Sequence, residues 1–245
     1  MMMDRSCFLK REKKVLVIIP AFNEASSIVG VVRGVKQSFP EADILVVDDG
    51  SKDATGELAR QEGAGVVRLP FNLGVGAALQ TGYRYALRYA YEFVVQLDAD
   101  GQHDPLYLPE LLRPLSEDQV DLVIGSRFLE RSRFPGSWTR LVGIKIFAFL
   151  TWLATGQRLT DPTSGYRAMR RSVVEFFCSD FFPHDYPDAD VLITTCRAGF
   201  RLKEIPVVMK ERLTGCSLHR GLKPFYYIYK MFLSILVSVL RQDWR

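Results

Sequence analysis

Hydrophobic and polar positions alternate along the first half of the chain in a pattern typical of β–α units. Continuous apolar runs predict strands at 15–19, 44–47, 66–69, 93–97 and 121–125. Between them, helical spacing or helix-favouring composition predicts helices from Ile28 to Val35, at 52–62 and at 76–91. Because strands that alternate with helices form parallel sheets covered on both faces, we expect an α/β fold: a mostly parallel central sheet with flanking helices.

The pattern changes beyond residue 125. Residues 144–154 predict a strongly apolar helix, about 11 residues long and short of the roughly 20 needed to cross a bilayer. The proline-punctuated stretch 176–190 predicts a loop, 190–198 predicts a helix, and 202–209 contains a short strand. Residues 224–240 are apolar nearly all round. They predict a C-terminal apolar helix that either lies in the membrane interface or packs on the domain or a second subunit.

Length and charge narrow the class of protein. A chain of 245 residues with a formal net charge of +4 is long enough for one large α/β domain. From 197 to 245 it carries ten Lys and Arg against three Asp and Glu. Such an excess can bind nucleic acid, anionic lipid or a phosphorylated substrate. No nucleic-acid motif accompanies it, so we expect no nucleic-acid partner and favour lipid or phosphate.

Cysteine spacing and the first residues bear on location. The four cysteines form no Cys-x-x-Cys pair, which argues against a zinc site and favours reduced thiols. Residues 1–14 are basic and lack the apolar core of a signal peptide. We therefore expect a protein that is not exported.

An acidic pair follows the predicted strand at 93–97. In extended backbone, residues two apart point to the same side, so Asp98 and Asp100 can offer two carboxylates to one cation. Mg²⁺ is commonly held by one or two carboxylates together with substrate phosphates. The pair predicts a metal-bridged diphosphate at the end of the strand; the alternative is a polar turn.

Two more strand ends in the same half are polar. They are Pro20 to Glu24 and Asp48 to Ser51, and in open α/β sheets ligands lie outside the carboxyl ends of the strands. A carboxylate such as Asp49 can accept from ribose hydroxyls or a base N–H. The loop from Asn72 to Gly76 opens a predicted helix, whose N-terminus favours an anion; alternatively it only packs that helix against a strand.

Six motifs occur in a family-specific order. They are Val17-Ile-Ile-Pro-Ala-Phe-Asn-Glu24, Val46-Val-Asp-Asp-Gly-Ser51, Asn72-Leu-Gly-Val-Gly76, Asp98-Ala-Asp-Gly-Gln-His103, Gly125-Ser-Arg127 and Asp161-Pro-Thr-Ser-Gly-Tyr-Arg167. The chain resembles family-two inverting glycosyltransferases, most closely the branch with dolichol-phosphate mannosyltransferase and bacterial polyprenyl-phosphate relatives. The resemblance implies a GT-A fold over 15–220, preceded by a basic tail at 1–14 and followed by an apolar and basic helix at 221–245 that contacts the membrane interface or another subunit.

The resemblance also implies roles for individual residues. Nucleotide-sugar donor contacts would come from Pro20, Ala21, Glu24, Asp49, Asn72, Gly76, Asp98, Ala99, Asp100, Gln102 and Arg212. A Mg²⁺ or Mn²⁺ cofactor would be held by Asp98, Asp100 and Gln102. The acceptor and the phosphates would meet Arg127, Arg131, Ser164 and Arg167, and the catalytic set would be Asp100, Arg127 and Asp190.

The implied activity is transfer of a hexose from GDP-mannose or UDP-glucose to a polyprenyl phosphate, with inversion. A lipid phosphate is already anionic and needs no strong base, whereas a sugar hydroxyl would need one. Asp190 is the first candidate for that base and Asp188 the second, and either can instead cap the following helix. The expected location is peripheral, at the cytoplasmic face of a membrane, on an anionic surface or a membrane partner protein, with a homo-oligomer possible.

Other readings stay open. One is transfer to a glycan or lipid-linked sugar hydroxyl with Asp190 as base, and another is a non-catalytic nucleotide-sugar or membrane-binding subunit. The intact pair of Asp98 and Asp100 argues against the second. Relatives often carry a Lys after the serine that corresponds to Ser217, where this chain has Leu218-His219-Arg220, with Arg220 or Lys223 as substitutes. His103 is interpreted as an ordinary loop residue.

Overall fold

The computed structural model describes residues 14–129, 138–179, 182–183, 187–210, 230, 232–235 and 237. The strands are β1 (Val15–Ala21), β2 (Asp43–Asp48), β3 (Gly65–Arg68), β4 (Phe93–Gln96), β5 (Leu122–Ser126), β6 (Arg167–Arg170) and β7 (Leu202–Pro206). The helices are α1 (Ile28–Ser38), α2 (Thr55–Gln61), α3 (Val75–Arg88), α4 (Leu108–Ser116), α5 (Trp138–Thr155), α6 (Arg171–Phe177) and α7 (Ala189–Arg197), with a short 3₁₀ turn, η2 (Pro105–Tyr107), before α4.

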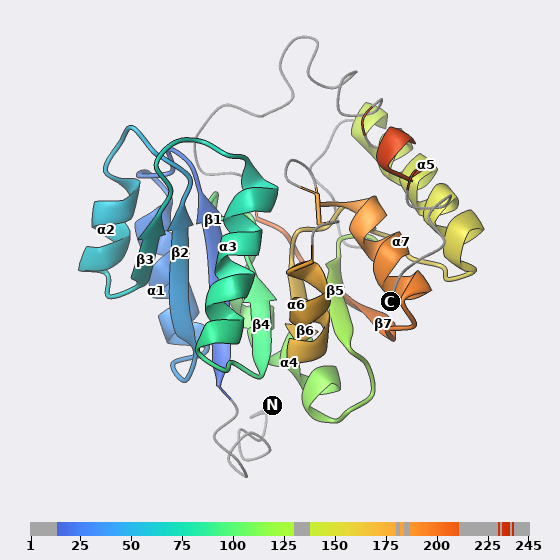
Figure 1. The fold of residues 1–245 in the computed structure, drawn as a ribbon, viewed down its shortest axis with the longest axis horizontal. Coiled ribbons are helices and arrows are strands. Elements are labelled where there is room, and N and C mark those ends of the chain that lie inside the picture. Colours follow the sequence, from blue (N-terminus) through green and yellow to red (C-terminus); the bar gives the residue numbers. More distant parts are fainter. Residues whose placement is uncertain are drawn as a thin grey trace.

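These strands form one seven-stranded sheet in the order β3-β2-β1-β4-β6-β5-β7 (Figure 1). β1 lies between β2 and β4 and is parallel to both, and its residues 15–19 are almost completely buried. Apolar side chains on both faces of a strand need cover on both faces. The predicted α/β fold with a mostly parallel sheet is therefore confirmed.

β6 is a strand that the hydrophobic pattern did not predict. It runs antiparallel to both neighbours, with Val95 opposite Ala168 and Ile124 opposite Arg167. Only four residues long, it has an arginine at each end, so it presents no apolar run. Pairing with β4 and β5 makes this segment a strand, and these partners are distant in sequence.

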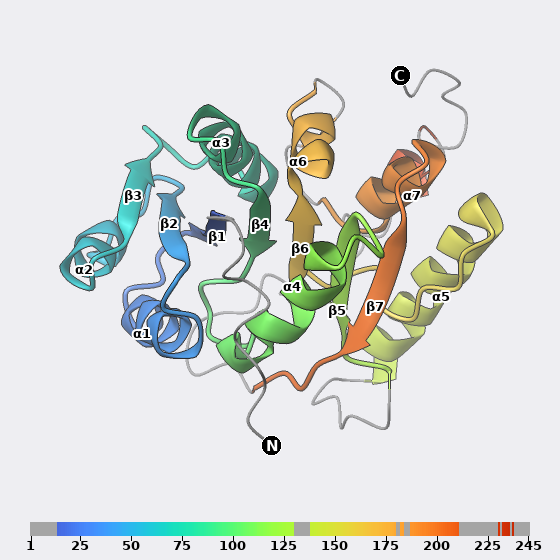
Figure 2. The ribbon, with the colours of Figure 1, turned by 90° about the horizontal axis from the view of Figure 1, so that it is seen from below.

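Helices cover the two faces of the sheet in separate layers (Figure 2). α1 and α4 pack with the odd-numbered residues of β1, whereas α3 and α6 pack with the even-numbered ones. Because successive strand residues point to opposite faces, one strand supplies both cores. α5 lies outside these layers and packs against α7 (Figure 2).

Several predicted boundaries in the second half were wrong. The helix expected at 144–154 extends over 18 residues as α5. The loop expected from Phe176 begins later, because Phe176 and Phe177 end α6, where Phe177 is buried in the core. α4 was not predicted, although Leu108, Leu111, Leu112 and Leu115 have helical spacing and are buried. Prolines at 109 and 114 obscured that signal.

The C-terminal segment is described only in part. Lys230, the residues 232–235 and Val237 are helical, and Ile235 is buried in a small apolar cluster with Phe147, Ala189 and Ile193. The rest of the predicted helix at 224–240 lies outside the described residues, as does nearly all of the basic tail at 1–14. Across the part of the chain that the structure describes, none of the helices is both long and apolar enough to span a membrane.

Candidate functional site

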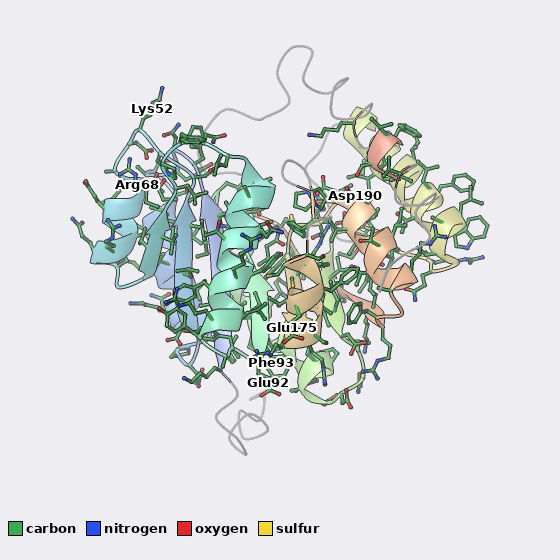
Figure 3. The ribbon with its side chains drawn as sticks, viewed as in Figure 1. Lys52, Arg68, Glu92, Phe93, Glu175 and Asp190 are labelled. Carbon is green, nitrogen blue, oxygen red and sulfur yellow. The ribbon has the colours of Figure 1, made fainter. Side chains whose placement is uncertain are left out.

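Every described candidate residue lies at one edge of the sheet. The parallel strands β1, β2, β4, β5 and β7 all end there, and the antiparallel β6 begins there. In Figure 3 Lys52 marks this edge, just past the end of β2, while Glu92 and Phe93 mark the opposite edge, where β4 begins. The topology thus gathers loops from the whole chain onto one surface, as expected for a ligand site in an open α/β sheet.

Asp49 joins the loop after β2 to the start of α3. Its carboxylate accepts hydrogen bonds from the N–H groups of Leu73 (2.8 Å) and Gly74 (2.9 Å). Burial raises the pKa of Asp49, and the two backbone donors act in the opposite direction. Gly50 is required beside it: with φ at +71°, a Cβ there would lie 2.7 Å from the carbonyl carbon of Phe71.

The loop after β1 is fastened to the loop after β2. The N–H of Asn23 donates to Ser51 Oγ at 2.9 Å, and Asn23 Oδ1 accepts from the N–H of Lys52 at 2.8 Å. The N–H of Glu24 donates to Thr55 Oγ1, and the half-buried Glu24 carboxylate accepts from Ser27 Oγ. The two loops therefore form one rigid wall.

The remaining donor-side candidates also lie along this wall. Pro20 and Ala21 end β1, Asn72 is exposed just before α3, and Gly76 is buried in the first turn of α3. The N-cap of α3 is Gly74, which has φ of +98° and brings no side chain to the helix N-terminus. Because the first N–H groups of a helix have no acceptor within the helix, this end of α3 suits an anion.

Asp98 and Asp100 lie beyond the end of β4, not within it. β4 ends at Gln96, and Ala99 and Asp100 belong to a turn in which Gly101 has φ of +79°. The expectation of extended backbone from Asp98 to Asp100 was therefore wrong, because the ladder stops earlier. The Asp98 side chain is 42% exposed, and the half-buried Asp100 accepts from the N–H of Gln102 at 3.0 Å.

These residues fit a hard divalent cation. Two partly exposed carboxylates and the side chain of Gln102 on one tight turn offer only oxygen ligands, and Mg²⁺ commonly completes such a set with substrate phosphates and water. No group of three or more His, Cys, Asp or Glu side chains within the described ranges could hold a metal alone. Ala99 is buried in the core, so its side chain does not face a ligand.

His103 has a more specific place than a loop residue. The buried imidazole accepts at Nδ1 from the N–H of Asp98 (3.0 Å), and its Nε2 lies 3.6 Å from Asp98 Oδ2. Its ring stacks on Tyr166, with centroids 4.8 Å apart and planes 14° apart. Burial lowers the pKa of His103 to about 4, so the ring is neutral near pH 7.

The loop before β6 approaches the acidic pair closely at Gly165. A Cβ at Gly165 would lie 3.2 Å from Asp98 Oδ1 and 3.3 Å from Asp98 Oδ2. Both distances are tighter than ordinary contact, so the absence of a side chain lets this loop pass beside the Asp98 carboxylate. The sequence marks the position only by a glycine, and glycines are common in loops.

Arg127 and Asp161 form a buried ion pair at the same edge. Arg127 donates from Nε and from its Nη2 to the two oxygens of Asp161, both at 2.6 Å, and Asp161 Oδ2 also accepts from the N–H of Arg127. Arg127 is 4% exposed and Asp161 is fully buried. The predicted phosphate-facing arginine is thus held in a bidentate pair, a geometry that suits the planar guanidinium.

Arg167 and Ser164 are also buried and satisfied within the protein. The Arg167 guanidinium donates to the carbonyl oxygens of Pro162, Ser164, Pro187 and Asp188, and Ser164 Oγ donates to the carbonyl oxygen of Gly125 at 2.6 Å. Arg167 is 1% exposed. Its visible contacts tie the loop before β6 to the start of α7, so direct phosphate contact stays a prediction.

Asp190 lies in the first turn of α7, 2% exposed. Its Oδ1 accepts from the N–H groups of Asp188 (3.1 Å) and Val191 (2.8 Å), and its Oδ2 accepts from Ser234 Oγ of the C-terminal helix. Burial raises its pKa to about 6. Asp188 is the N-cap residue, but its side chain makes no capping hydrogen bond. Two further candidates, Arg131 and Arg212, lie outside the described residues.

Comparison with known proteins identifies the family of this chain. Residues 16–177 match the model of glycosyl transferase family 2. An undecaprenyl-phosphate mannosyltransferase of Micrococcus luteus is 35% identical over 85% of this chain and 88% of its own. A UDP-N-acetylglucosamine–dolichyl-phosphate N-acetylglucosaminyltransferase of Methanococcus voltae is 29% identical over 94% of this chain and 99% of its own.

The fold is also similar to that of a solved structure. Glucosyl-3-phosphoglycerate synthase of Mycobacterium tuberculosis, in complex with Mn²⁺, UDP and glucosyl-3-phosphoglycerate, is similar with a TM-score of 0.71 and 25% identity, over 96% of this chain and 81% of that one. The fold is therefore that of the GT-A glycosyltransferases. Within that class, the chain belongs to glycosyltransferase family 2 and is a glycosyltransferase.

Proposed function

We propose that this chain is an inverting, metal-dependent glycosyltransferase that moves a hexose from a nucleotide sugar to a polyprenyl phosphate at a membrane surface. One observation carries the proposal: the acidic turn at 98–102 lies at the same sheet edge as the wall around Asp49 and the buried pair of Arg127 and Asp161. The residues proposed for the donor, the metal and the acceptor would then lie next to one another. Relatives named for transfer to lipid phosphates support the acceptor class.

On the donor side, the wall at the ends of β1 and β2 offers groups suited to a nucleoside. Pro20, Ala21, Glu24 and Asp49 line it, and the amides at the start of α3, near Asn72 and Gly76, suit an anionic phosphate. The hydrogen bonds from Leu73 and Gly74 fix the Asp49 carboxylate. A fixed acceptor can recognise hydroxyl or base N–H groups without first losing conformational freedom.

At the diphosphate, Asp98, Asp100 and Gln102 would hold Mg²⁺ or Mn²⁺, which neutralises charge that develops on the leaving nucleoside diphosphate. On the acceptor side, Arg127 would meet a phosphate from within its pair with Asp161, and Arg131, outside the described residues, would add positive charge. Arg212, also outside the described residues, would add positive charge on the donor side. Each cation that stabilises the negative charge on the leaving diphosphate lowers the barrier to its departure. Attack on the opposite face of the anomeric carbon would invert its configuration.

On the acceptor side, the burial of Asp190 supports a lipid phosphate as nucleophile. Both carboxylate oxygens already accept hydrogen bonds, one of them from Ser234. An anionic phosphate oxygen needs no general base to remove a proton before it attacks. Transfer to a lipid phosphate would therefore not require Asp190 to be accessible as a base. Ser164 and Arg167 would shape this side by holding the loop before β6.

Membrane association at the cytoplasmic face is part of the proposal. Large apolar side chains are exposed on α5 and on the C-terminal helix: Ile146, Phe149, Trp152, Leu153, Phe232, Leu233 and Val237. The two helices touch through the rings of Phe147 and Phe232. An exposed apolar surface of this kind, together with the excess of basic residues in the sequence from 197 to 245, suits an anionic bilayer.

The surface can be tested with vesicles containing phosphatidylglycerol. Phe149→Asp should reduce co-sedimentation of the full chain with these vesicles. Tyr89→Asp is the matched control, since Tyr89 is a similarly exposed aromatic residue, 50% against 56% for Phe149, at the far end of α3. Equal sedimentation of the two variants would assign the apolar surface to a second copy of the chain or a membrane partner protein.

The decisive experiment for the activity is sugar transfer with purified chain and polyprenyl phosphate in vesicles. Labelled GDP-mannose and labelled UDP-glucose are supplied separately, each with Mn²⁺ or with a chelator. Labelled lipid that forms only with metal supports the proposal and identifies the sugar. If labelled lipid also forms in the presence of chelator, the metal assignment is overturned. If neither transfer nor hydrolysis occurs with a wider panel of donors, a non-catalytic binding subunit is favoured.

A second candidate function is transfer to a sugar hydroxyl with Asp190 as base. The observation in its favour is the pKa of Asp190, which burial raises to about 6, because a base works best with a pKa close to the working pH. Release of nucleoside diphosphate with a glycan acceptor but not with polyprenyl phosphate would select this candidate. Asp190→Asn should then abolish transfer, since the amide cannot take up the proton.

A further inference from the structure

The buried His103 side chain contacts the loop that carries Asp98 and Asp100 from the interior of the protein. The imidazole Nδ1 accepts from the N–H of Asp98 at 3.0 Å, so the proton of the neutral ring is on Nε2. That Nε2 lies 3.6 Å from Asp98 Oδ2. His103 therefore touches both the backbone and the carboxylate of one proposed metal ligand, although the side chain itself is 2% exposed and faces the interior.

His103 is itself fixed from two directions. Its ring stacks on Tyr166, whose hydroxyl donates to the carbonyl oxygen of Asp104 at 3.0 Å. Its backbone forms an isolated antiparallel bridge with Met209, and the N–H of Lys210 donates to the carbonyl oxygen of Gln102 at 2.9 Å. The loop after β4, the loop before β6 and the segment after β7 thus meet at this one residue.

We propose that His103 is a positioning residue for the metal site: by accepting from the Asp98 N–H while stacked on Tyr166, it sets the direction of the Asp98 carboxylate. This proposal rests on the metal-dependent function proposed above. Asp98 lies two residues beyond Gln96, the last residue of β4, and so outside the strand ladder. Outer partners of metal ligands commonly change metal affinity about 10- to 100-fold when they are removed.

A purely structural role makes a different prediction. If His103 only filled space, an aromatic ring of similar size would replace it without loss at the metal site. If the Nδ1 acceptor matters, a smaller side chain with an acceptor at the same place would replace it better. Two variants separate these roles: His103→Phe keeps the stack and removes the acceptor, and His103→Asn places an amide oxygen near Nδ1 and removes the stack.

The test measures Mn²⁺ binding to the full chain by electron paramagnetic resonance of free Mn²⁺, in the presence of UDP or GDP and without acceptor. We expect His103→Phe to bind Mn²⁺ at least about 10-fold more weakly than the wild type and His103→Asn within about 3-fold. Circular dichroism and thermal unfolding identify a temperature at which all forms are folded. Should His103→Phe not fold, His103→Gln replaces it, because its amide reaches the Nε2 position and leaves Nδ1 without a substitute.

The outcomes separate this proposal from the proposed function. Wild-type affinity in the folded His103→Phe variant would overturn the positioning role, as would equal weakening in the phenylalanine and asparagine variants. If the wild type itself binds no Mn²⁺ with either nucleotide, the metal-dependent function fails instead. A parallel titration of transfer activity against Mn²⁺ should show the His103→Phe defect shrinking as Mn²⁺ approaches saturation.

Discussion

The two halves of the site hold their charged groups in different ways. In the first half, from β1 to the turn at 98–102, carboxylates accept mainly from backbone N–H groups: Asp49 from Leu73 and Gly74, and Asp100 from Gln102. In the second half, from β5 to α7, Arg127 pairs with Asp161 and the Arg167 guanidinium binds four carbonyl oxygens.

This difference separates groups that can serve a ligand from groups that hold the frame. Backbone amides stabilise a carboxylate without adding an opposite unit charge, and where such a carboxylate is also partly exposed, as Asp100 is, it can bind a cation. A buried arginine and its carboxylate neutralise each other, and each leaves an uncompensated charge if the other is removed. Substitution of a charged residue should therefore reduce mainly activity in the first half of the site and mainly stability in the second half.

The largest effect should come from Asp100→Ala. Loss of one of two carboxylates from the proposed metal site should reduce metal-dependent transfer on the order of 1,000-fold or more, because neutralisation of the leaving diphosphate is lost. Stability should change little, since Asp100 is half-buried and accepts from the N–H of Gln102 within its own turn. Transfer rates and urea unfolding check both parts; unchanged turnover would remove the metal assignment.

Asp161→Ala should show the reverse pattern, with stability as the main loss. Removing one member of a buried pair costs about 3–5 kcal/mol of unfolding free energy, since Arg127 would keep a buried charge without its partner. The control is Glu62→Ala, which breaks the exposed pair with Arg33 and should cost much less, because solvent screens exposed ion pairs. Urea denaturation measures both, and equal costs would contradict the distinction between the halves.

Gly165→Ala tests the place where the two halves meet. The added Cβ would press on the Asp98 carboxylate at 3.2 Å, so we expect Mn²⁺ to bind roughly 10-fold more weakly, similar to the loss of an outer partner. Gly30→Ala is a control, because a Cβ there meets nothing within 4 Å. Unchanged Mn²⁺ affinity in a folded Gly165→Ala protein would show that the loop before β6 yields without moving Asp98.

The effect of Asp190 on stability should depend on pH. Its folded pKa of about 6 exceeds the value of about 3.9 of a free aspartate, so the folded state binds the extra proton. Stability is then favoured at low pH and falls as pH rises from about 4 to 6. The unfolding free energy of the wild type minus that of Asp190→Asn should fall over this window and level off above it. A flat difference would contradict the buried, proton-binding carboxyl.

Much of the first half could be predicted from local pattern. The apolar runs of β1, β2 and β4 and the helical spacing of α1 are properties of neighbouring residues, and burial of both sheet faces converts them directly into a fold. The polar residues after β1, β2 and β4 followed from the same reasoning, because parallel strands end at one edge. Even there, the end of β4 at Gln96 came one residue earlier than expected and changed how Asp98 is oriented.

The second half resisted such prediction for reasons of distance in the chain. β6 has no hydrophobic signal of its own and exists through pairing with β4 and β5. The burial of Arg127 depends on Asp161, 34 positions away. Two of the four carbonyl oxygens that Arg167 binds belong to Pro187 and Asp188, just before α7. Nothing in the spacing of charged residues distinguishes a buried pair from two exposed ions.

The sequence by itself determined the α/β class, the parallel sheet around β1, the polar strand ends and the family to which they belong. Each of these rests on residues close together in the chain or on motifs in a fixed order. The tertiary structure decided that His103 supports Asp98, that Gly165 lets the loop before β6 reach it, and that Asp190 is bound by Ser234 of the C-terminal helix. Those contacts join segments brought together only by folding, so their energies are set by packing, not by local propensity.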